Sequence, residues 1–478
     1  MNMRLPIRVN WLGWLLVITG ALITANATVT GNKIFFAPLL LLGLWGWIRF
    51  ATRYPAAALI IVIFFAENCF DIFSLGLNKR FLSDIGIALM LPLIVLHFRR
   101  GWNHITQDRS PYAVAILIFF CAIVISLYFG SHLTFGQPMA IGLTVARKHL
   151  LFLSYFFMVA VGANREECYR FMKYLAWLGA VIAFLSIIEA FLGGGVIFSN
   201  YYAVGQERAG MLRIHVGTFL VVFSVIYSFI QWQHSPNTSQ QRFGYLLLLG
   251  MGLTTLVFVV MTRAVYLGLM VIFALWMVRK ITNRKIMFLC TAVSLLAILF
   301  ISGLGDFILS ETFIGEIAKE TSAELGADKG NISIRQKGAQ YYMDLMLDNA
   351  PLTGVGIFSF TNFPNNPVTQ AAEHYHYYIV DTNGITTLVY FGLQGALLLA
   401  FFSIKSLKDT FDGVRYSEGI NKYHLEILFF VFIYTLATPT LNNIIVERML
   451  IYSGVFFYLL SISFTKNQSL LVKRQLNE

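Results

Sequence analysis

The sequence predicts an all-α protein that crosses a membrane many times. Of its 478 residues, 57% are hydrophobic and only 12% are charged, whereas a soluble domain carries about 25% charged residues. The mean hydropathy is +0.69. A chain with so much apolar surface cannot bury all of it in a water-soluble core, so lipid must be its solvent.

Apolar windows of about 20 residues, the length that a helix needs to cross the hydrocarbon core, recur along the whole chain. No internal repeat and no Gly/Ser- or Pro-rich linker separates them, so we expect a single membrane domain over residues 1–478. The first apolar run lacks a small-x-small cleavage site, so we expect it to be retained. The windows predict about fourteen transmembrane helices, at 11–28, 34–50, 56–75, 81–98, 111–129, 148–163, 172–197, 214–232, 244–262, 264–280, 286–303, 384–404, 425–443 and 448–465.

The net charge of +11 follows this topology. If the N-terminus is cytoplasmic, most of the 35 basic residues fall in cytoplasmic segments, as the positive-inside rule requires. The excess of basic residues therefore indicates how the chain is oriented in the plasma (inner) membrane. It does not indicate a surface that binds nucleic acid. Both termini are expected in the cytoplasm. The large loop 304–380, inserted between the eleventh and twelfth predicted helices, is expected on the periplasmic or outer side.

Metal and disulfide chemistry find little support in the sequence. The four cysteines are scattered and show no CxxC or other ligand spacing, so neither disulfides nor a thiolate metal site are expected. No cluster of His, Cys and carboxylate residues has ligand spacing, and no DxD pair lies on an outside loop. We therefore expect no metal and no cofactor. The cysteines are Cys69, Cys121, Cys168 and Cys290.

The large loop has a helical part and a turn part, both within "IRQKGAQYYMDLMLDNAPLTGVGIFSF", residues 334–360. Polar Arg335, Gln336, Gln340 and Asp344 lie mostly opposite the apolar residues at helical spacing, which predicts an amphipathic helix. Pro351 ends it. The "TGVGIF" that follows either exposes backbone N–H groups or makes a tight turn. It follows a helix end, whereas phosphate-cradling glycine loops precede a helix start.

Four segments, in this order, carry a family resemblance. "ERAGMLRIHVGTF" resembles an Arg-containing loop that ends in Gly-Thr-Phe, and "MTRAVYLGL" resembles a Ser/Thr-Arg-Gly/Ala segment between two helices. The stretch 334–360 resembles an arginine, an aromatic-containing helix and Pro-Leu-x-Gly-Val-Gly. "DTNGITTLVYFGLQGALLL" resembles a His or Asp before a helix with Gly-Leu-x-Gly. From about Gln206 to Leu399, the ordered set resembles the O-antigen ligase and Wzy-type polysaccharide polymerase superfamily.

This resemblance implies a multi-spanning glycosyltransferase of the GT-C type. Members of the superfamily move glycans from undecaprenyl diphosphate to an acceptor on the outer face of the plasma membrane, and the ligases work without a metal. The paired arginines of the family fall on Arg263 and Arg335. The histidine of the ligases falls on Asp381, a departure that leaves His374 and His376, just upstream, as further candidate bases.

The chemistry of such a transfer fits these residue types. A diphosphate that leaves an anomeric carbon gains negative charge in the transition state, and fixed cations lower that barrier. Guanidinium suits the task because it binds phosphate oxygens in bidentate fashion and stays protonated. The acceptor hydroxyl needs a base, which Asp381, His376 or His374 would supply. Candidate cations on the outer side are Arg208, Arg213, Arg263 and Arg335.

Each of these residues also has a structural interpretation. Arg263 would snorkel at a helix end, Arg335 would be solvated on its helix, and Asp381 would cap the following helix. The aromatic "EHYHYY" either lies in the interfacial belt or stacks on sugar rings. Three carboxylates near outer helix ends either line a cavity or reach water, and a deeper one needs a partner. The three are Glu67, Asp71 and Glu189, and the deeper one is Asp84.

Three functions remain open at this point. The first is a polysaccharide (O-antigen or exopolysaccharide) polymerase that joins lipid-linked repeat units, with a chain-length regulator as a candidate partner. The second is an O-antigen ligase that uses the same donor and a lipid A-core or protein acceptor. The third is a lipid-linked oligosaccharide transporter, which should show broken helices at mid-membrane and repeat symmetry. The polar groups instead gather at the outer helix ends, which favours an enzyme. Asp381 in place of histidine favours the polymerase.

Overall fold

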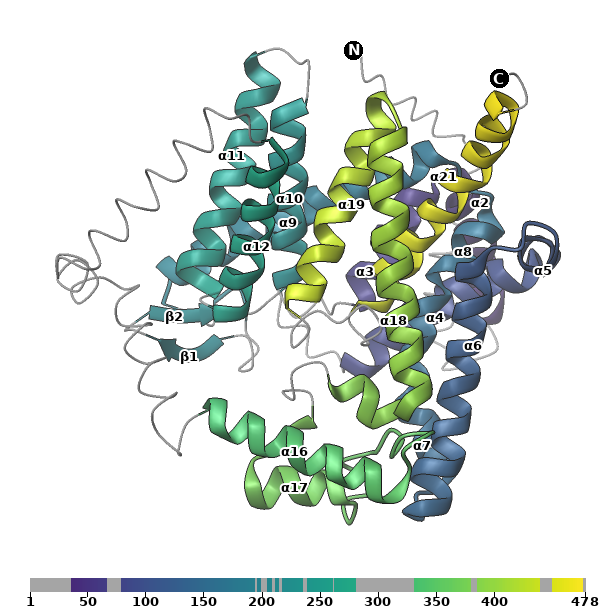
Figure 1. Cartoon of the computed structure of the whole chain (residues 1–478), viewed down its shortest axis with the longest axis vertical. Helices are drawn as coiled ribbons and strands as arrows, with labels where there is room; N and C mark the ends of the chain where they lie inside the picture. Colours follow the sequence, from purple (N-terminus) through teal and green to yellow (C-terminus); the bar gives the residue numbers. More distant parts are fainter. Residues whose placement is uncertain are drawn as a thin grey trace.

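The computed structural model describes residues 36–66, 79–193, 196–198, 204–208, 211–214, 217–234, 239–260, 262–280, 331–379, 385–438 and 449–475. Within these ranges the chain is helical except for turns and one two-stranded hairpin. The long helices run side by side in one bundle, and two shorter helices lie across one end of it (Figure 1). The C-terminal helix ends at the opposite end of the bundle.

The helices of the first half of the chain are α2 (Phe36–Arg53), α3 (Pro55–Ala66), α4 (Lys79–Leu96), α5 (Phe98–Thr106), α6 (Pro111–Ile125), η3 (Ser126–Thr134), α7 (Met139–Ala146), η4 (Arg147–Leu153), α8 (Ser154–Val161), α9 (Arg165–Phe191) and α10 (Thr218–His234). Those of the second half are α11 (Ser239–Thr255), η5 (Leu256–Val260), α12 (Arg263–Lys280), α16 (Asn331–Asn349), α17 (Pro367–Tyr375), α18 (Ile385–Tyr416), α19 (Gly419–Ala437) and α21 (Leu450–Gln475). Strands β1 (Val204–Arg208) and β2 (Met211–Ile214) pair antiparallel.

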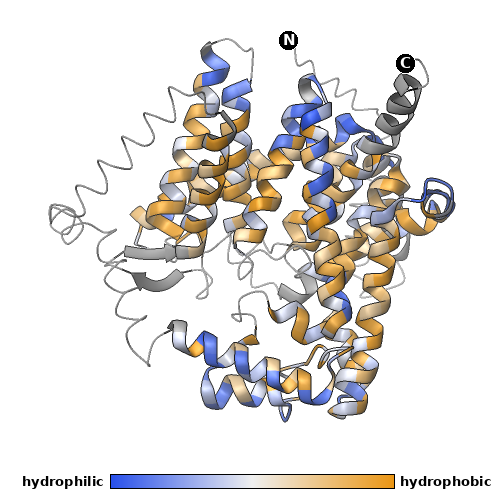
Figure 2. Cartoon of the chain, viewed as in Figure 1, coloured by the Kyte–Doolittle hydropathy of each residue, from blue (hydrophilic) through white to orange (hydrophobic). Residues whose placement is uncertain are grey.

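Apolar helices of spanning length confirm a polytopic membrane protein. Figure 2 shows apolar residues covering the bundle helices, whereas polar residues are frequent along α16 and α17. The predicted windows 11–28 and 286–303 lie outside the described residues, so the number fourteen stays a prediction. Within the described ranges, five helices are long and apolar enough to cross a membrane, and a sixth is obtained if Ser83–Leu96 and Phe98–Thr106, bent by 75°, form one span. The five are Pro111–Thr134, Met139–Val161, Arg165–Phe191, Gln240–Val260 and Ile385–Tyr416.

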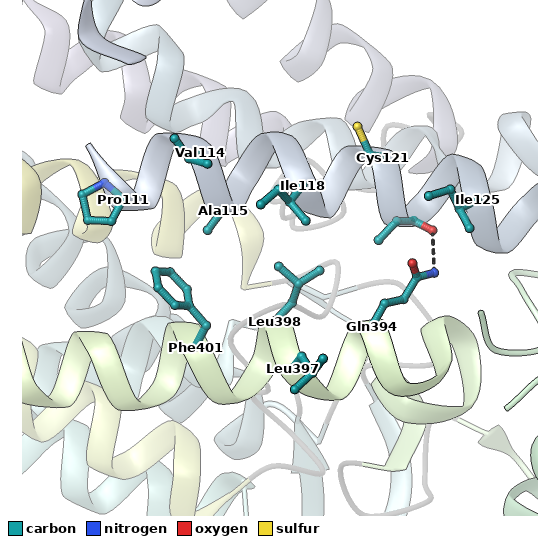
Figure 3. A pocket seen from close by; sticks show the side chains of 11 residues that line it. Pro111, Val114, Ala115, Ile118, Cys121, Ile125, Gln394, Leu397, Leu398 and Phe401 are labelled. Carbon is teal, nitrogen blue, oxygen red and sulfur yellow. Dashed lines mark hydrogen bonds between the residues drawn. The ribbon is translucent and has the colours of Figure 1, made fainter. Parts of the chain in front are cut away.

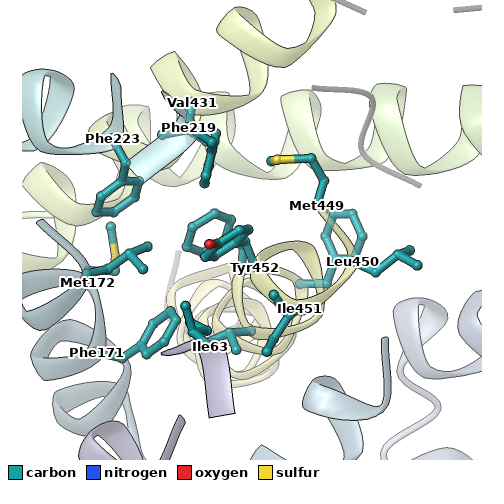
Figure 4. Close-up of a cluster of buried hydrophobic side chains, with 14 of the residues drawn as sticks. Ile63, Phe171, Met172, Phe219, Phe223, Val431, Met449, Leu450, Ile451 and Tyr452 are labelled. Carbon is teal, nitrogen blue, oxygen red and sulfur yellow. The ribbon is translucent and has the colours of Figure 1, made fainter. Parts of the chain in front are cut away.

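The main core lies where α3, α9, α10, α19 and α21 meet (Figure 4). Tyr452 of α21 is fully buried there, and its ring lies 4.8 Å from that of Phe219 on α10. Helices α9 and α10 come especially close, because a Cβ on Gly179 would lie 2.0 Å from the carbonyl oxygen of Leu220. Small residues at such crossings let membrane helices gain dispersion contacts, which replace the hydrophobic effect as a driving force in lipid.

Helices α16 and α17 have a small core of their own. It joins Tyr342 and Met346 of α16 to Val368 and Ala371 of α17 and to Val389 of α18. Asn366 caps α17 by accepting the backbone N–H of Thr369 at 2.9 Å, and Pro367 occupies the first helical position, an arrangement that favours a helix start. This part of the large loop is therefore a packed unit attached to the bundle through α18.

Candidate functional site

The predicted amphipathic helix of residues 334–347 is present as the central part of α16. The four polar residues Arg335, Gln336, Gln340 and Asp344 are exposed, and Tyr342 and Met346 are buried in the small core. The helix ends at Asn349, two residues before Pro351. The local pattern of the sequence thus predicted this element and its buried face correctly.

Two tyrosines of α16 attach it to α17 and to the segment behind it. The hydroxyl of Tyr342 donates to the carbonyl of Tyr377 at 2.6 Å, and that of Tyr341 donates to the carbonyl of Pro367 at 3.3 Å. Burial raises the pKa of the Tyr342 phenol, so this hydroxyl stays a donor at any physiological pH. The Tyr341 and Tyr377 rings lie 6.1 Å apart, and the Tyr377 and Tyr375 rings 5.5 Å apart.

The Gly-Val-Gly turn makes a backbone joint with α18. Helix α18 is interrupted at Gly392, whose φ of 61° and ψ of −151° are not helical. The carbonyls of Val389 and Tyr390 accept the N–H groups of Val355 (2.8 Å) and Gly356 (3.1 Å). In return, the N–H of Leu393 donates to the carbonyl of Pro351 at 3.0 Å.

The joint answers the question that "TGVGIF" leaves open in the sequence. Gly354 donates its N–H to the carbonyl of Ala350 at 2.8 Å, so the N–H groups of Gly354, Val355 and Gly356 are all bonded within the protein. The turn is therefore a structural clasp between the Pro-Leu-x-Gly-Val-Gly and Gly-Leu-x-Gly motifs, and the N–H groups of its Gly-Val-Gly segment are not available to a phosphate.

Glycines allow the two backbone segments of the clasp to approach each other closely, because glycine has no Cβ at the points of contact. A Cβ on Gly354, whose φ is 74°, would lie 2.4 Å from the carbonyl carbon and oxygen of Tyr390. A Cβ on Gly392 would lie 2.4 Å from the nitrogen of Gly354, and one on Gly130 of η3 would lie 2.3 Å from the Gly354 oxygen. Left-handed φ values and such approaches both require glycine.

Two polar residues in and directly after η3, which sequence reasoning missed, hold the two sides of the clasp: Gln137 bonds the turn and Ser126 bonds α18. The buried amide of Gln137 donates to the carbonyl of Ile357 at 2.8 Å and accepts the N–H of Ser359 at 2.9 Å. The hydroxyl of Ser126 donates to the carbonyl of Tyr390. The local signal was a run of small and polar residues, "GSHLTFGQP", directly after an apolar span. η3 is a π-helix, a form that is frequent at functional sites.

The structure places the four predicted arginines on elements at one end of the bundle. Arg335 is exposed on α16 and has no ion pair with any residue that the structure describes. Arg263 begins α12. Arg208 and Arg213 lie on the β1–β2 hairpin, where Arg208 pairs with Met211. The hairpin packs on η5, which directly precedes Arg263, and lies at the same end as α16 (Figure 1). The side chains of Arg208, Arg213 and Arg263 are outside the described part of the structure.

Of the three candidate bases, the two histidines lie within the described residues, at the end of α17. His374 is exposed in the last turn of α17. His376 is also exposed, and it ends α17 in a left-handed conformation with φ 57°, a position at which helices commonly stop. Asp381 lies outside the described residues. Among the residues that the structure describes, no three His, Cys, Asp or Glu side chains gather closely enough to hold a metal ion.

Two of the remaining carboxylates have clear structural partners. Glu189 is fully buried and accepts the N–H groups of Val196 (3.0 Å) and Ile197 (2.7 Å). The expectation that it lines a cavity or reaches water is therefore wrong, because it anchors the loop after α9 instead. Asp84 has the partner that its depth requires, since it pairs with the guanidinium of Arg147 at 2.8 Å. Glu67 and Asp71 lie outside the described residues.

Comparison with known proteins supports the resemblance seen in the motifs. The family model for O-antigen ligase matches residues 245–400, a stretch that includes most of α11, α12, α16, α17 and the first half of α18. No curated protein matches the chain. The matched stretch contains both sides of the glycine clasp and the positions of Arg263, Arg335 and Asp381. Residues 245–400, about a third of the chain, are therefore similar to the O-antigen ligase family.

Proposed function

We propose that this protein is a polysaccharide polymerase that joins undecaprenyl-diphosphate-linked oligosaccharide repeat units on the outer face of the plasma membrane. The family match supports activity of the O-antigen ligase or polymerase type. The observation that supports the proposal is where the elements that carry Arg263 and Arg335 lie. The start of α12, with Arg263, and α16, with Arg335, lie at one end of a bundle of membrane helices, where a lipid-linked donor presents its diphosphate.

In the proposed reaction, a hydroxyl of the acceptor sugar attacks the anomeric carbon of the donor. The new glycosidic C–O bond forms as the bond from that carbon to the diphosphate oxygen breaks, and the diphosphate leaves with the electron pair. Arg263 and Arg335, assisted by Arg208 and Arg213 from the hairpin, stabilise this developing charge. Asp381, or failing that His376 or His374, accepts the proton of the hydroxyl.

A reconstituted assay separates this function from its two alternatives. Purified protein in liposomes receives lipid-linked repeat units, and the products are resolved by size. A ladder of joined units in the absence of lipid A-core supports the polymerase. Product that forms only after lipid A-core or an acceptor protein is added identifies an O-antigen ligase. Movement of the lipid-linked glycan across the bilayer without any new glycosidic bond identifies a transporter and overturns the proposed chemistry.

Metal chelation should leave the transfer rate unchanged. In our proposal the arginines supply the positive charge that a divalent cation supplies in many other glycosyltransferases. The measurement is the initial rate of ladder formation with and without EDTA. A loss of activity in EDTA that magnesium or manganese restores would show that a cation takes part and would refute metal independence.

A substitution of Asp381 distinguishes its proposed role as the base from a role as the cap of the following helix. Asn caps a helix about as well as Asp but is a far poorer base. We therefore expect Asp381→Asn to abolish polymer formation while expression and Tm stay at wild-type values. His374→Ala and His376→Ala should reduce the rate only mildly, because both side chains are exposed at the end of α17. Normal polymer from Asp381→Asn together with loss in a histidine variant would assign the base to that histidine.

A further inference from the structure

Three tyrosine rings form a row on the insert, the unit made of α16, α17 and the residues that follow α17. Tyr341 lies on α16, Tyr375 is the last residue of α17, and Tyr377 lies just beyond it. The rings of Tyr341 and Tyr377 are 6.1 Å apart, and those of Tyr377 and Tyr375 are 5.5 Å apart with 29° between their planes. The row thus connects α16 to the end of α17.

The backbone fixes the middle ring of this row. Gly338 of α16 lies directly against Tyr377, since a Cβ on Gly338 would lie 3.3 Å from the Cβ and 3.5 Å from the Cδ1 of Tyr377. The hydroxyl of Tyr342 donates to the carbonyl of Tyr377 at 2.6 Å. His376 has a left-handed backbone with φ 57°, and this turn of the chain brings the rings on either side of it together. Tyr375 therefore stacks on a ring that is itself held in place.

Tyr375 ends the row with one face of its ring open. It is 59% exposed, although its other face is turned to Tyr377. Tyr378, which follows in the chain, is 50% exposed. A tyrosine ring offers a large, flat contact area and loses little conformational entropy when it binds, because it has only two χ angles. The open face of Tyr375 is therefore suited to hold a flat ligand.

The polar surroundings of Tyr375 favour a sugar over lipid as this ligand. Glu373, His374 and His376 are all exposed, so most side chains close to Tyr375 in the chain are polar. A tyrosine of the interfacial belt has its ring beside an apolar surface that faces lipid. A pyranose ring instead has an apolar face of C–H bonds and a rim of hydroxyl groups, which fit a flat aromatic ring with hydrogen-bonding groups around it.

The pocket between α6 and α18 offers a sugar much less (Figure 3). It has a volume of about 540 Å³, and its lining is apolar apart from Cys121 and Gln394. The amide of Gln394 donates to the carbonyl of Ala122 at 3.3 Å. Sugar hydroxyl groups would lose their water there and gain few hydrogen bonds in return, which costs free energy. The tyrosine row is therefore the better candidate for a carbohydrate site.

The middle of the row lies one helical turn from Arg335. Arg335 and Gly338 are three residues apart on α16, and residues at this spacing are neighbours on a helix surface. Because Tyr377 packs on Gly338, the row extends away from the arginine that holds the donor diphosphate in our proposed function. The sugars that react at this diphosphate are then next to the row.

We infer that the open face of Tyr375 binds a pyranose ring of the glycan substrate. The inference rests on the proposed function, because it takes the glycan from there. Both the donor and the acceptor supply such a ring, and the stacking chemistry is the same for each. Stacking restricts the rotation of the glycan before the glycosidic bond forms, and this orientation lowers the barrier to transfer.

A binding experiment tests the inference without turnover. The probe is the repeat-unit oligosaccharide, freed from its lipid diphosphate by mild acid, and its Kd is measured for the full-length protein in lipid nanodiscs. Tyr375→Phe keeps the ring and should bind within about twofold of wild type, whereas Tyr375→Leu is apolar without a flat face and should raise Kd about five- to tenfold. Tyr416→Leu is the matched control. Tyr416 is also 59% exposed, but it ends α18 at the other end of the bundle.

Kinetics then show whether the donor or the acceptor supplies the ring. The free oligosaccharide is varied as acceptor at saturating lipid-linked donor, and the donor is varied at saturating acceptor. A rise in KM for the acceptor alone in Tyr375→Leu assigns the ring to the acceptor, and a rise for the donor alone assigns it to the donor. Unchanged KM for both substrates, together with normal ladder formation, would refute the sugar site and leave the proposed function intact.

Two further results separate the site from its alternatives. If wild type binds the oligosaccharide, Tyr375→Leu weakens binding and no variant forms a glycosidic bond, the sugar site stands and the polymerase function fails. A photo-crosslinking phenylalanine analogue at position 375 distinguishes sugar from lipid. Crosslinks to the oligosaccharide support the site. Crosslinks to phospholipid alone, or no binding of the oligosaccharide by wild type, would overturn it and place the ring in the interfacial belt.

Discussion

Replacing Arg263 or Arg335 with lysine should lower the rate of polymer formation about 10–100-fold. Lysine keeps the positive charge but presents a single ammonium, so it loses the paired N–H groups that bind two phosphate oxygens at once. Preorganised donors of this kind are worth about 10²–10³ in rate when one is removed. The positive charge of the lysine should keep part of this stabilisation, so we expect a smaller loss of rate than removal of the whole side chain would cause.

Substitution of Arg335 should not disturb the packing of the insert. Arg335 is exposed on α16, so the lysine variant should keep the packing of Tyr342 and Met346 and the wild-type Tm. Arg415→Lys is the matched control, because Arg415 is also exposed but lies in the last turn of α18, at the other end of the bundle. Single-turnover rates and donor KM are measured for each variant. If both lysine variants form polymer at the wild-type rate, the diphosphate is held by other groups.

Gly354→Ala is expected to open the clasp between the insert and α18. The new methyl group would lie 2.4 Å from the backbone of Tyr390, and backbone atoms cannot turn aside as a flexible side chain can. The turn must therefore move, which breaks the hydrogen bonds from Val355 and Gly356 to α18. We expect a destabilisation of about 1–3 kcal/mol from overpacking, and loss of most activity because α16 no longer holds its position.

Gly136→Ala is a close control for this variant. Gly136 has a φ of 75°, almost equal to the 74° of Gly354, but a Cβ there would meet nothing within 4 Å. Both variants thus share the cost of a left-handed alanine, about 1–2 kcal/mol, and only Gly354→Ala adds the collision. Limited proteolysis of the insert, Tm and polymer formation are compared. Equal effects of the two substitutions would show that the close contact at Gly354 has no role in holding the insert.

The local properties of the sequence were sufficient for the class of fold and for the shape of α16. Composition and apolar windows indicate membrane helices because the need for about 20 apolar residues is a property of each segment alone. The buried face of α16 follows equally from its own periodicity, since Tyr342 and Met346 are four residues apart on one side of a helix. The family resemblance, carried by short motifs in order, was confirmed over residues 245–400.

The contacts that build the site depend on partners far away in the chain. Gln137 and Ile357 are 220 residues apart, and no local pattern shows that they bond. The turn "TGVGIF" has the same local sequence whether its N–H groups are free or used. Only the break at Gly392 in α18, which frees two carbonyls, decides that the N–H groups of Val355 and Gly356 are used. Local periodicity therefore determined which segments are helices and which of their faces are buried. The contacts between the helices required the tertiary structure. Backbone N–H and C=O groups are the same in nearly every residue, so the sequence does not show which of them bond to each other.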